Sequence, residues 1–235
     1  MFNESKSVDL TISRLLEKLV PLFADFEIVI TDDGSTDDSA EKVNAWALRD
    51  PRIVLVRLPF NQRFGGALRA GFRQASKELL FYTDFDLPVD LNCLPGVIQE
   101  FAEAEVLTGF SDELSKHENM RTMIVSKTYN FLVRNLFNLQ LRDINFGFKA
   151  MRQSVLRQVS LHSNSPFVGA ELFVQALRAG YRIKEIPVPF SERKLGRSQI
   201  RRIDVVCATL IDILKLRMSL GFRFQRATAP SETVI

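Results

Sequence analysis

Apolar positions follow two alternating spacings along the first half of the chain. Helical spacing over residues 8–22 gives way to a short apolar run at 26–30, and this order of helix and strand repeats as far as residue 108. Strands separated by helices of about 10–15 residues indicate βαβ units and a largely parallel sheet. The pattern therefore predicts an α/β fold whose first half is a sheet of the nucleotide-binding type.

The expected elements are less regular after residue 108. The pattern predicts strands at 26–30, 53–56, 78–83, 105–108 and 181–188, and a loop at 143–149. It predicts helices at 8–22, 39–48, 65–75, 94–104, 120–137, 154–159, 168–179 and 200–220. No linker or repeat divides the chain, so we expect a single domain.

Composition and charge exclude several classes of protein. The 235 residues are 46% hydrophobic and 25% charged, which is typical of a folded domain. A net charge of +3 is too small to indicate nucleic acid as a partner. Two cysteines cannot staple a fold of this size, so we expect a reducing, cytoplasmic setting. The sequence contains neither an apolar run long enough to span a membrane nor the apolar core of a signal peptide.

Two acidic clusters stand where predicted strands end. Asp32 and Asp33 follow the strand at 26–30, and Asp84 and Asp86 follow the strand at 78–83. Ligands of such sheets bind beyond the carboxyl ends of the strands. Carboxylates at positions i and i+2 can converge on one hard cation, which bridges them to substrate phosphates. Solvated loops and helix caps also use these residues, but two clusters at two strand ends favour a binding site.

Several further motifs occur in a fixed order and carry a resemblance. They are Asn3-Glu4, Asp32–Asp37, Asn61 with Gly65-Gly66, Asp84–Asp86, Asp143 with Gly147–Lys149, and Arg193-x-x-Gly196-x-Ser198. This succession resembles the inverting glycosyltransferases with a GT-A fold, in their dolichyl- or polyprenyl-phosphate mannosyl- and glucosyltransferase branch. The resemblance implies a GT-A catalytic domain with a mostly parallel sheet over residues 1–198, followed by an amphipathic helix and tail over 199–235.

The resemblance also implies an activity and a donor site. The activity is metal-dependent inverting transfer of a hexose from UDP-glucose or GDP-mannose to polyprenyl or dolichyl phosphate. The nucleoside would be held by Asp32 or Asp33 together with Asn3 and Glu4. Asp84 and Asp86 would hold Mg²⁺ or Mn²⁺ against the diphosphate, which makes Asp86 a catalytic residue. Gly65 and Gly66 would either allow close backbone approach to the donor or merely start a helix.

A lipid phosphate acceptor is already anionic, so its binding requires cations. Arg193 and Ser198 match the family pattern position by position, and Arg121 matches it approximately. A guanidinium group grips phosphate oxygens in a bidentate manner, so Arg193 is expected to be catalytic. Glu171 stands where related transferases place an acidic residue near the acceptor, although it also suits the first turn of a helix.

The chain departs from the family pattern in two places. Leu87-Pro88 stands where the mannosyl branch commonly has Leu-Gln, which favours a glucosyl-like enzyme. Met1 immediately precedes Phe2-Asn3-Glu4, so the apolar first strand of the family is absent. Because that strand lies in mid-sheet beside residues 26–30, we expect a gap there, and we expect the source DNA to encode the strand upstream.

The predicted helix at 200–220 and the identity of the acceptor leave alternatives open. The helix carries an apolar stripe with basic neighbours, and its apolar residues are Ile203, Val206, Leu210, Ile213, Leu214 and Leu220. Such a helix suits the cytoplasmic surface of an anionic membrane, or it packs on the domain's own sheet. The alternative functions are transfer to a saccharide or protein hydroxyl, with Glu171 as base, and non-catalytic binding of a nucleotide sugar.

Overall fold

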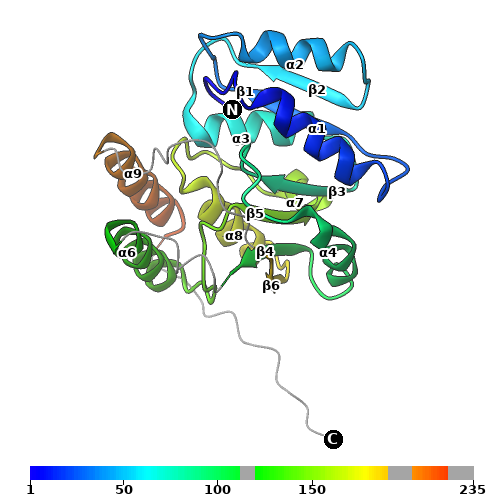
Figure 1. Cartoon of the computed structure of the whole chain (residues 1–235). Coiled ribbons are helices and arrows are strands. Elements are labelled where there is room, and N and C mark those ends of the chain that lie inside the picture. The colour runs from blue at the N-terminus through cyan, green and yellow to red at the C-terminus, as the bar shows by residue number, and fades with distance from the viewer. Residues whose placement is uncertain (112–119, 190–202, 222–235) are drawn as a thin grey trace, which may run out of the picture.

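The structure is a computed structural model that describes residues 1–111, 120–189 and 203–221 (Figure 1). The first half contains α1 (Val8–Leu19), β1 (Ile28–Asp32), α2 (Ser39–Ala47), β2 (Ile53–Arg57), α3 (Arg63–Gln74) and β3 (Leu79–Thr83). Every helix and strand predicted up to β3 is therefore present, with boundaries shifted by at most a few residues.

The second half follows the same prediction with one exception. It contains η1 (Leu91–Cys93), α4 (Leu94–Glu100), β4 (Val106–Phe110), α6 (Met120–Phe137), β5 (Phe148–Arg152), α7 (Gln153–Gln158), α8 (Val168–Arg178), β6 (Ile183–Pro187) and α9 (Ile203–Ser219). The exception is β5, because its first residues fall in the segment 143–149 that was predicted as a loop. Lys149 interrupts an otherwise apolar run, and this charge concealed a strand that is buried on both faces.

The strands form a mixed sheet in two parts. β1 pairs with β2 in parallel, while the larger part has the order β3-β5-β4-β6. β4 and β6 are parallel, but β5 runs antiparallel to both β3 and β4. The expected α/β class with its parallel sheet is confirmed. β3, β4 and β6 run in the same direction, and β5 lies between β3 and β4 in the opposite direction.

Among the described residues, no strand lies between β1 and β3, which is where the sequence predicted a gap. Met1 alone continues the pairing of β1: its amino group donates to the Thr31 carbonyl at 2.7 Å, and its carbonyl accepts from the Asp33 N–H at 2.9 Å. Helix α1 bridges the break, because Leu15 and Leu19 pack against the hydrophobic clusters of both parts.

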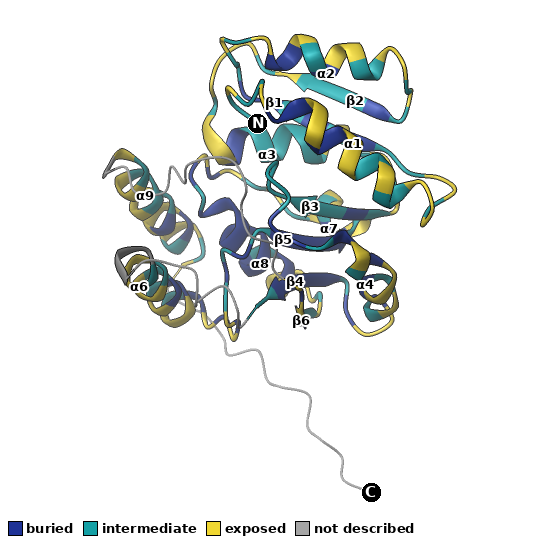
Figure 2. Ribbon diagram, in the orientation of Figure 1, coloured by how far each residue is buried: buried dark blue, intermediate teal, exposed yellow. Residues whose placement is uncertain are grey.

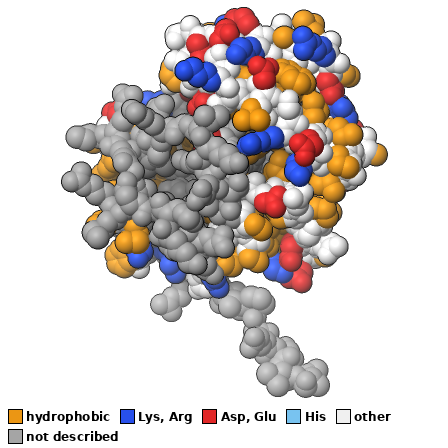
Figure 3. Space-filling view, viewed as in Figure 1, with side chains coloured by type: hydrophobic (Ala, Val, Ile, Leu, Met, Phe, Trp, Pro, Cys, Tyr) orange, Lys and Arg blue, Asp and Glu red, His pale blue; other side chains and the backbone are white. Residues whose placement is uncertain are grey.

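Helices cover both faces of the larger part of the sheet. α6, α7, α8 and α9 share one hydrophobic cluster with Leu80, Val106 and Met151, while α1 and α4 pack on the opposite face against Leu107 and Phe148. Figure 2 shows α8 as almost wholly buried, and its polar residues Glu171, Gln175 and Arg178 follow one side of the helix. In Figure 3, acidic and basic side chains are interspersed over the described part of one face.

Candidate functional site

The loop after β1 and the start of the chain form one unit. The Asn3 N–H donates to Ser35 Oγ at 2.9 Å, and the Asn3 side-chain oxygen accepts from the Thr36 N–H at 2.9 Å. The Glu4 N–H donates to Ser39 Oγ, also at 2.9 Å. The structure therefore brings together Asn3 and Glu4 with the Asp32–Asp37 loop, as the sequence predicted.

The neighbouring carboxylates of this loop have different partners. Asp32 is fully buried, and both of its oxygens accept from the Ser35 N–H at 3.3 Å. The Arg57 guanidinium lies 4.0 Å from the Asp32 carboxylate. Asp33 accepts from the Gln62 N–H at 2.6 Å, and burial raises the pKa of its carboxyl group above the usual range. Both groups therefore anchor backbone around the ends of β1 and β2.

A pocket of about 380 Å³ opens beside this loop. It is lined by Gly34, Ser35, Thr36, Arg57, Leu58 and Pro59. The lining comes from the carboxyl ends of two parallel strands, the position where ligands bind to such sheets. Backbone N–H groups, hydroxyls and one guanidinium offer donors to an anionic or carbonyl-bearing ligand.

The second acidic loop begins directly after β3. The Tyr82 hydroxyl donates to Asp84 Oδ1 at 2.5 Å, and the Asp84 N–H donates to the Gly147 carbonyl at 3.4 Å. A Cβ atom on Gly147 would lie 2.9 Å from Asp84 Oδ2, so a larger residue here would displace the carboxylate. Thr11 of α1 donates to the Phe85 carbonyl at 3.2 Å. The Asp84–Asp86 loop is thus held between β5 and α1.

The two acidic loops face a common region near the start of the chain. Burial lowers the pKa of the Met1 amino group, while the negative charges of Asp32, Asp33, Glu4 and Asp84 oppose that shift. One cation therefore lies within the field of both clusters. Phe85 of the second loop and Met1 also pack against the same hydrophobic cluster, which includes Ile28 and Ile30 of β1.

The residues of the second loop suit a divalent cation shared with a substrate. Among the described residues, no group of three or more His, Cys, Asp or Glu side chains could enclose a metal ion by itself. Asp84 and Asp86 offer oxygen ligands alone, the donor set that Mg²⁺ prefers, and Mg²⁺ usually binds through one or two carboxylates plus phosphates and water. These residues fit a half-site that a diphosphate would complete.

Gly65 and Gly66 are explained by packing. The Gly65 N–H donates to the Asn164 carbonyl at 3.0 Å, and a Cβ atom there would lie 2.1 Å from the Ser163 carbonyl oxygen. A Cβ atom on Gly66 would meet Gln62 at 2.5 Å. These contacts favour the interpretation that the two glycines let α3 start against the 163–164 loop, and their contact with a donor stays a prediction.

Glu171 is a buried carboxylate whose oxygens are occupied by backbone. It is 2% exposed and accepts from the His162 N–H at 3.0 Å and the Ser163 N–H at 2.9 Å. Gln175, one turn later, accepts from the Ser160 N–H at 3.0 Å. The side chains of α8 therefore hold the 160–163 loop in place, and a catalytic role for Glu171 stays a prediction.

The side chains expected to bind the acceptor phosphate all lie outside the described part of the structure. Arg193 and Ser198 lie outside the described residues. Arg121 belongs to the first turn of α6, and its side chain also lies outside them. Their roles remain those that the family resemblance implies.

Sequence reasoning missed a buried centre behind Asp84. Lys149 is 4% exposed, and its ammonium group donates to the Phe146 carbonyl at 2.8 Å. Burial lowers the pKa of Lys149 to about 8, against the opposing charges of Asp84 and Asp143. A lysine within an apolar run beside a lone aspartate was the available signal. Its position opposite Tyr82 follows from the pairing of β3 with β5, which no local pattern reveals.

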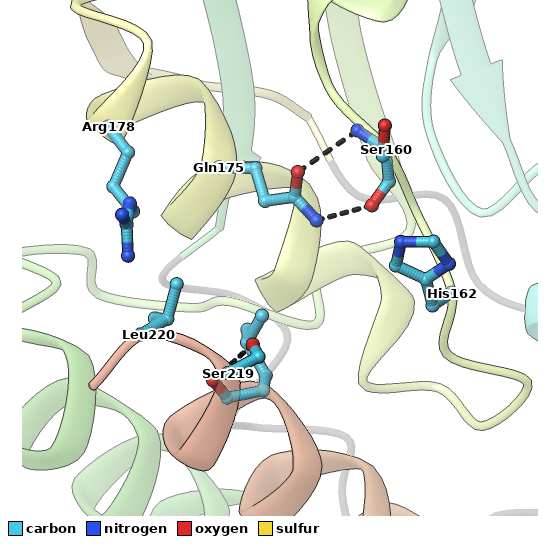
Figure 4. Close-up of a pocket in the computed structure, with 7 residues that line it drawn as sticks. Ser160, His162, Gln175, Arg178, Ser219 and Leu220 are labelled. Carbon is cyan, nitrogen blue, oxygen red and sulfur yellow. Dashed lines mark hydrogen bonds between the residues drawn. The ribbon is translucent and has the colours of Figure 1, made fainter.

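A second pocket, of about 320 Å³, lies between α8 and the end of α9 (Figure 4). Its lining residues are Ser160, His162, Gln175, Arg178, Leu216, Ser219 and Leu220. Gln175 bonds both the N–H and the carbonyl of Ser160, which closes one side. None of the residues predicted to bind donor or metal lines this pocket.

Comparison with known proteins places these features in a family. Residues 1–160 match the profile described as glycosyl transferase family 2. The chain is 30% identical over 202 residues to the glycosyltransferase AglD of Haloferax volcanii, covering 82% of this chain and 32% of that protein. It is 28% identical to the undecaprenyl-phosphate mannosyltransferase of Micrococcus luteus, covering 85% and 84% respectively. The chain thus spans about a third of the first relative's length and most of the second's.

A third relative and the solved structures extend the comparison. The undecaprenyl-phosphate 4-deoxy-4-formamido-L-arabinose transferase of Pectobacterium carotovorum is 26% identical, with 85% of this chain and 60% of that protein covered. Glucosyl-3-phosphoglycerate synthase from Mycobacterium tuberculosis, in complex with Mn²⁺ and UDP-glucose, superposes with a TM-score of 0.65 at 17% identity. That superposition covers 93% of this chain and 77% of the synthase, which shows the GT-A-like fold.

Proposed function

Because the chain belongs to glycosyl transferase family 2, and is therefore a glycosyltransferase, we propose that it transfers a hexose from a nucleoside-diphosphate sugar to a polyprenyl phosphate. The observation that carries the proposal is that two acidic loops lie around the start of the chain: Asn3 bonds the Asp32–Asp37 loop, and Phe85 of the Asp84–Asp86 loop packs against the same hydrophobic cluster as Met1. The relatives named for undecaprenyl phosphate support the choice of acceptor.

The nucleoside belongs, in this proposal, beside the first acidic loop. The pocket next to Ser35 and Arg57 has the size and the hydrogen-bonding groups for a nucleoside. Asn3 and Asp32 hydrogen-bond Ser35, which lines the pocket, and we assign Glu4 and Asp33 to the same site. The donor is UDP-glucose or GDP-mannose, and Leu87-Pro88 favours the glucose donor.

Mg²⁺ or Mn²⁺ belongs at the second loop, held by Asp84 and Asp86. When bound there, the ion supplies Lewis-acid stabilisation of the charge that develops on the leaving nucleoside diphosphate. Tyr82 and Gly147 fix the Asp84 carboxylate so that it is ready for this role. Solved neighbours of this fold hold Mn²⁺ with UDP-glucose, or Mg²⁺ with UDP.

The acceptor phosphate belongs against the arginines of the later motifs. Arg193 and Arg121 provide the positive charge that brings two anionic substrates together, and Ser198 provides a hydroxyl donor. A phosphate nucleophile is ionised near neutral pH and needs little help from a general base. Glu171, whose oxygens already accept backbone N–H groups, is therefore not required as a base.

A lipid acceptor places the protein at a membrane surface, on its cytoplasmic face in this proposal. No described helix is both long and apolar enough to cross a bilayer. α9 buries Ile213 and Leu216 in the core while exposing a second apolar row, which comprises Val206, Leu210, Ile211, Leu214 and Met218. α6 lies alongside α9 and exposes Ile124, Val125 and Phe131. Such apolar helix faces suit shallow insertion among lipid headgroups.

The experiment is a screen of sugar nucleotides against short polyprenyl phosphates, with products identified by mass spectrometry. We expect one donor to yield a polyprenyl-phosphate hexose in the presence of Mg²⁺ or Mn²⁺. A hexose attached instead to a saccharide or protein hydroxyl would contradict the acceptor. Nucleotide binding without any product would contradict the enzymatic proposal and favour a binding module.

A further inference from the structure

Lys149 is an ammonium ion enclosed in the middle of the larger part of the sheet. It lies on β5, is 4% exposed, and makes one hydrogen bond of 2.8 Å to the Phe146 carbonyl. The rings of Tyr82 and Phe173 flank it, with centroids 5.9 Å and 5.5 Å from Nζ. Burying a charge in such surroundings is costly unless opposite charges compensate for it.

The fold is built around this side chain. Gly169 of α8 leaves the room it needs, since a Cβ atom there would lie 3.1 Å from Lys149 Cε and 3.5 Å from Nζ. Helix α8 therefore closes over the lysine, while β3 covers it with Tyr82. Lysine side chains are usually flexible and hydrated. Here, elements far apart in the sequence enclose the Lys149 side chain and hold it in one place.

Two carboxylates compensate for the buried charge. Asp84 and Asp143 both raise the pKa of Lys149 against the effect of burial. Lys149 in turn lowers the pKa of Asp143, which burial raises. Asp84 Oδ1 also accepts a hydrogen bond of 2.5 Å from the Tyr82 hydroxyl. Lys149 pairs with Tyr82 across β5 and β3, and its ammonium group bonds the Phe146 carbonyl, next to Gly147, whose own carbonyl accepts from the Asp84 N–H.

We propose that Lys149 is a positioning residue of this transferase, which holds the Phe146–Gly147 backbone and so keeps the Asp84 carboxylate in the orientation that binds the divalent cation. This inference rests on the proposed function, because that function assigns the metal to Asp84 and Asp86. Lys149 is enclosed and acts through Asp84 rather than on the substrate. Partners that orient metal ligands typically contribute 10–100-fold to metal affinity or activity.

The sign of the effect separates this role from a simple electrostatic one. A positive charge near a metal site repels the metal, so removal of that charge by itself would tighten binding. Loss of a positioning contact leaves Asp84 less ordered and weakens binding. A purely structural lysine would change stability and leave the metal affinity of the folded protein unaltered.

The test is Mn²⁺ affinity in the presence of saturating UDP or GDP, measured on the full chain by electron paramagnetic resonance, because a diphosphate completes this half-site. We expect Lys149→Met, which keeps the length and removes the charge, to raise the Mn²⁺ dissociation constant roughly 10-fold or more. Circular dichroism checks that the variant is folded. Unchanged or tighter Mn²⁺ binding by a folded variant overturns the proposal, as does the lack of any Mn²⁺ binding by the wild-type chain.

Tyr82→Phe provides a second variant in case Lys149→Met does not fold. It removes the Tyr82 hydroxyl that donates to Asp84 and keeps the ring. We expect this variant also to weaken Mn²⁺ binding. Where both variants fold, the double variant should lose less affinity than the product of the two single losses, because both act through one carboxylate. Fully independent effects would overturn the assignment. Mn²⁺ binding requires no sugar transfer, so this result and the failure of the proposed activity are distinguishable.

Discussion

Asp32 and Asp33 are adjacent in the chain, yet their carboxylates lie in different surroundings. Asp32 points into the turn after β1 and accepts from Ser35, whereas Asp33 reaches the start of α3 through Gln62. The family resemblance implied that one or the other holds the nucleoside, and the sequence could not decide between them. Backbone N–H groups of the protein already donate to oxygens of both carboxylates. Which N–H groups reach them depends on backbone geometry, and residue type alone does not reveal it.

Glu171→Gln tests which role the buried carboxylate has. Glutamine has one acceptor oxygen, so it cannot receive the backbone N–H groups of both His162 and Ser163 in the same way. We expect a loss of about 1–3 kcal/mol in the free energy of unfolding, measured by urea denaturation. We also expect kcat to change by less than about 10-fold, whereas loss of a true general base would cost about 10²–10⁴. A large kcat loss with unchanged stability would contradict the structural role.

Gly65→Ala tests the packing of α3 on the 163–164 loop. A methyl group at Gly65 would overlap the Ser163 carbonyl, and we expect a loss of about 1–3 kcal/mol in the free energy of unfolding. Gly96→Ala in α4 is the matched control, because nothing lies within 4 Å of a Cβ atom there. The control should be unchanged or up to about 1 kcal/mol more stable. Equal stability of the two variants would refute the packing interpretation.

At the scale of elements, hydrophobic periodicity predicted nearly all the helices and strands, because each follows from local spacing. It missed β5, whose pairing with β3 and β4 is a long-range property. It also missed the role of the loop between α7 and α8. Arg69 of α3 donates to Asn164 at 2.6 Å, and Asp212 of α9 accepts from Ser165 at 3.1 Å. Such contacts between distant segments leave no periodic pattern.

For α9 the sequence offered packing or a membrane surface, and the structure gives the helix one buried and one exposed apolar side. Cys207 lies on the exposed side and provides a labelling site there. Burial raises the pKa of the other thiol, Cys93, to about 11, so little thiolate forms at pH 8 and a maleimide should react mainly at Cys207. We expect the emission of an environment-sensitive dye at Cys207 to shift to the blue with anionic vesicles.

Substitutions on the exposed row test the same surface. Leu210→Glu with Leu214→Glu should weaken vesicle binding roughly 10-fold or more without lowering thermal stability, because both side chains are exposed. Leu48→Glu, at an 82% exposed position after α2, is the control and should bind like the wild type. Equal vesicle binding by all three proteins would contradict a membrane role for α9.

At the scale of the whole molecule, the break in the sheet has a consequence for stability. The bonds of Met1 to Thr31 and Asp33 have the pattern of parallel pairing, so residues added before Met1 would run along the open side of β1. We expect a five-residue Val/Ile extension ending in proline to raise the melting temperature by several degrees. An extension of five Gly and Ser residues is the control. No difference between the two would show that the space between β1 and β3 does not accept a strand.

Much of the donor half of the site could be predicted because it lies in short motifs at strand ends. The resemblance assigned Asn3-Glu4, the Asp32–Asp37 loop and the Asp84–Asp86 loop to one site. The structure brings the first two together, and Phe85 of the third packs against the same cluster as Met1, while their contact with a donor stays a prediction. The supporting centre of Tyr82, Asp143 and Lys149 could not be predicted, because it forms only when β5 inserts next to β3.

The central claim is that the Asp84–Asp86 loop binds the divalent cation needed for sugar transfer to a polyprenyl phosphate. The most direct measurement is the initial rate of that transfer for the wild type, Asp86→Asn and Asp90→Asn, with Mg²⁺ and in excess chelator. We expect chelator to abolish wild-type transfer and Asp86→Asn to lose about 10²-fold or more. Asp90→Asn makes the same charge change at the residue that caps η1 and should stay near the wild-type rate. Full wild-type activity in chelator, or an active Asp86→Asn variant, would contradict the claim.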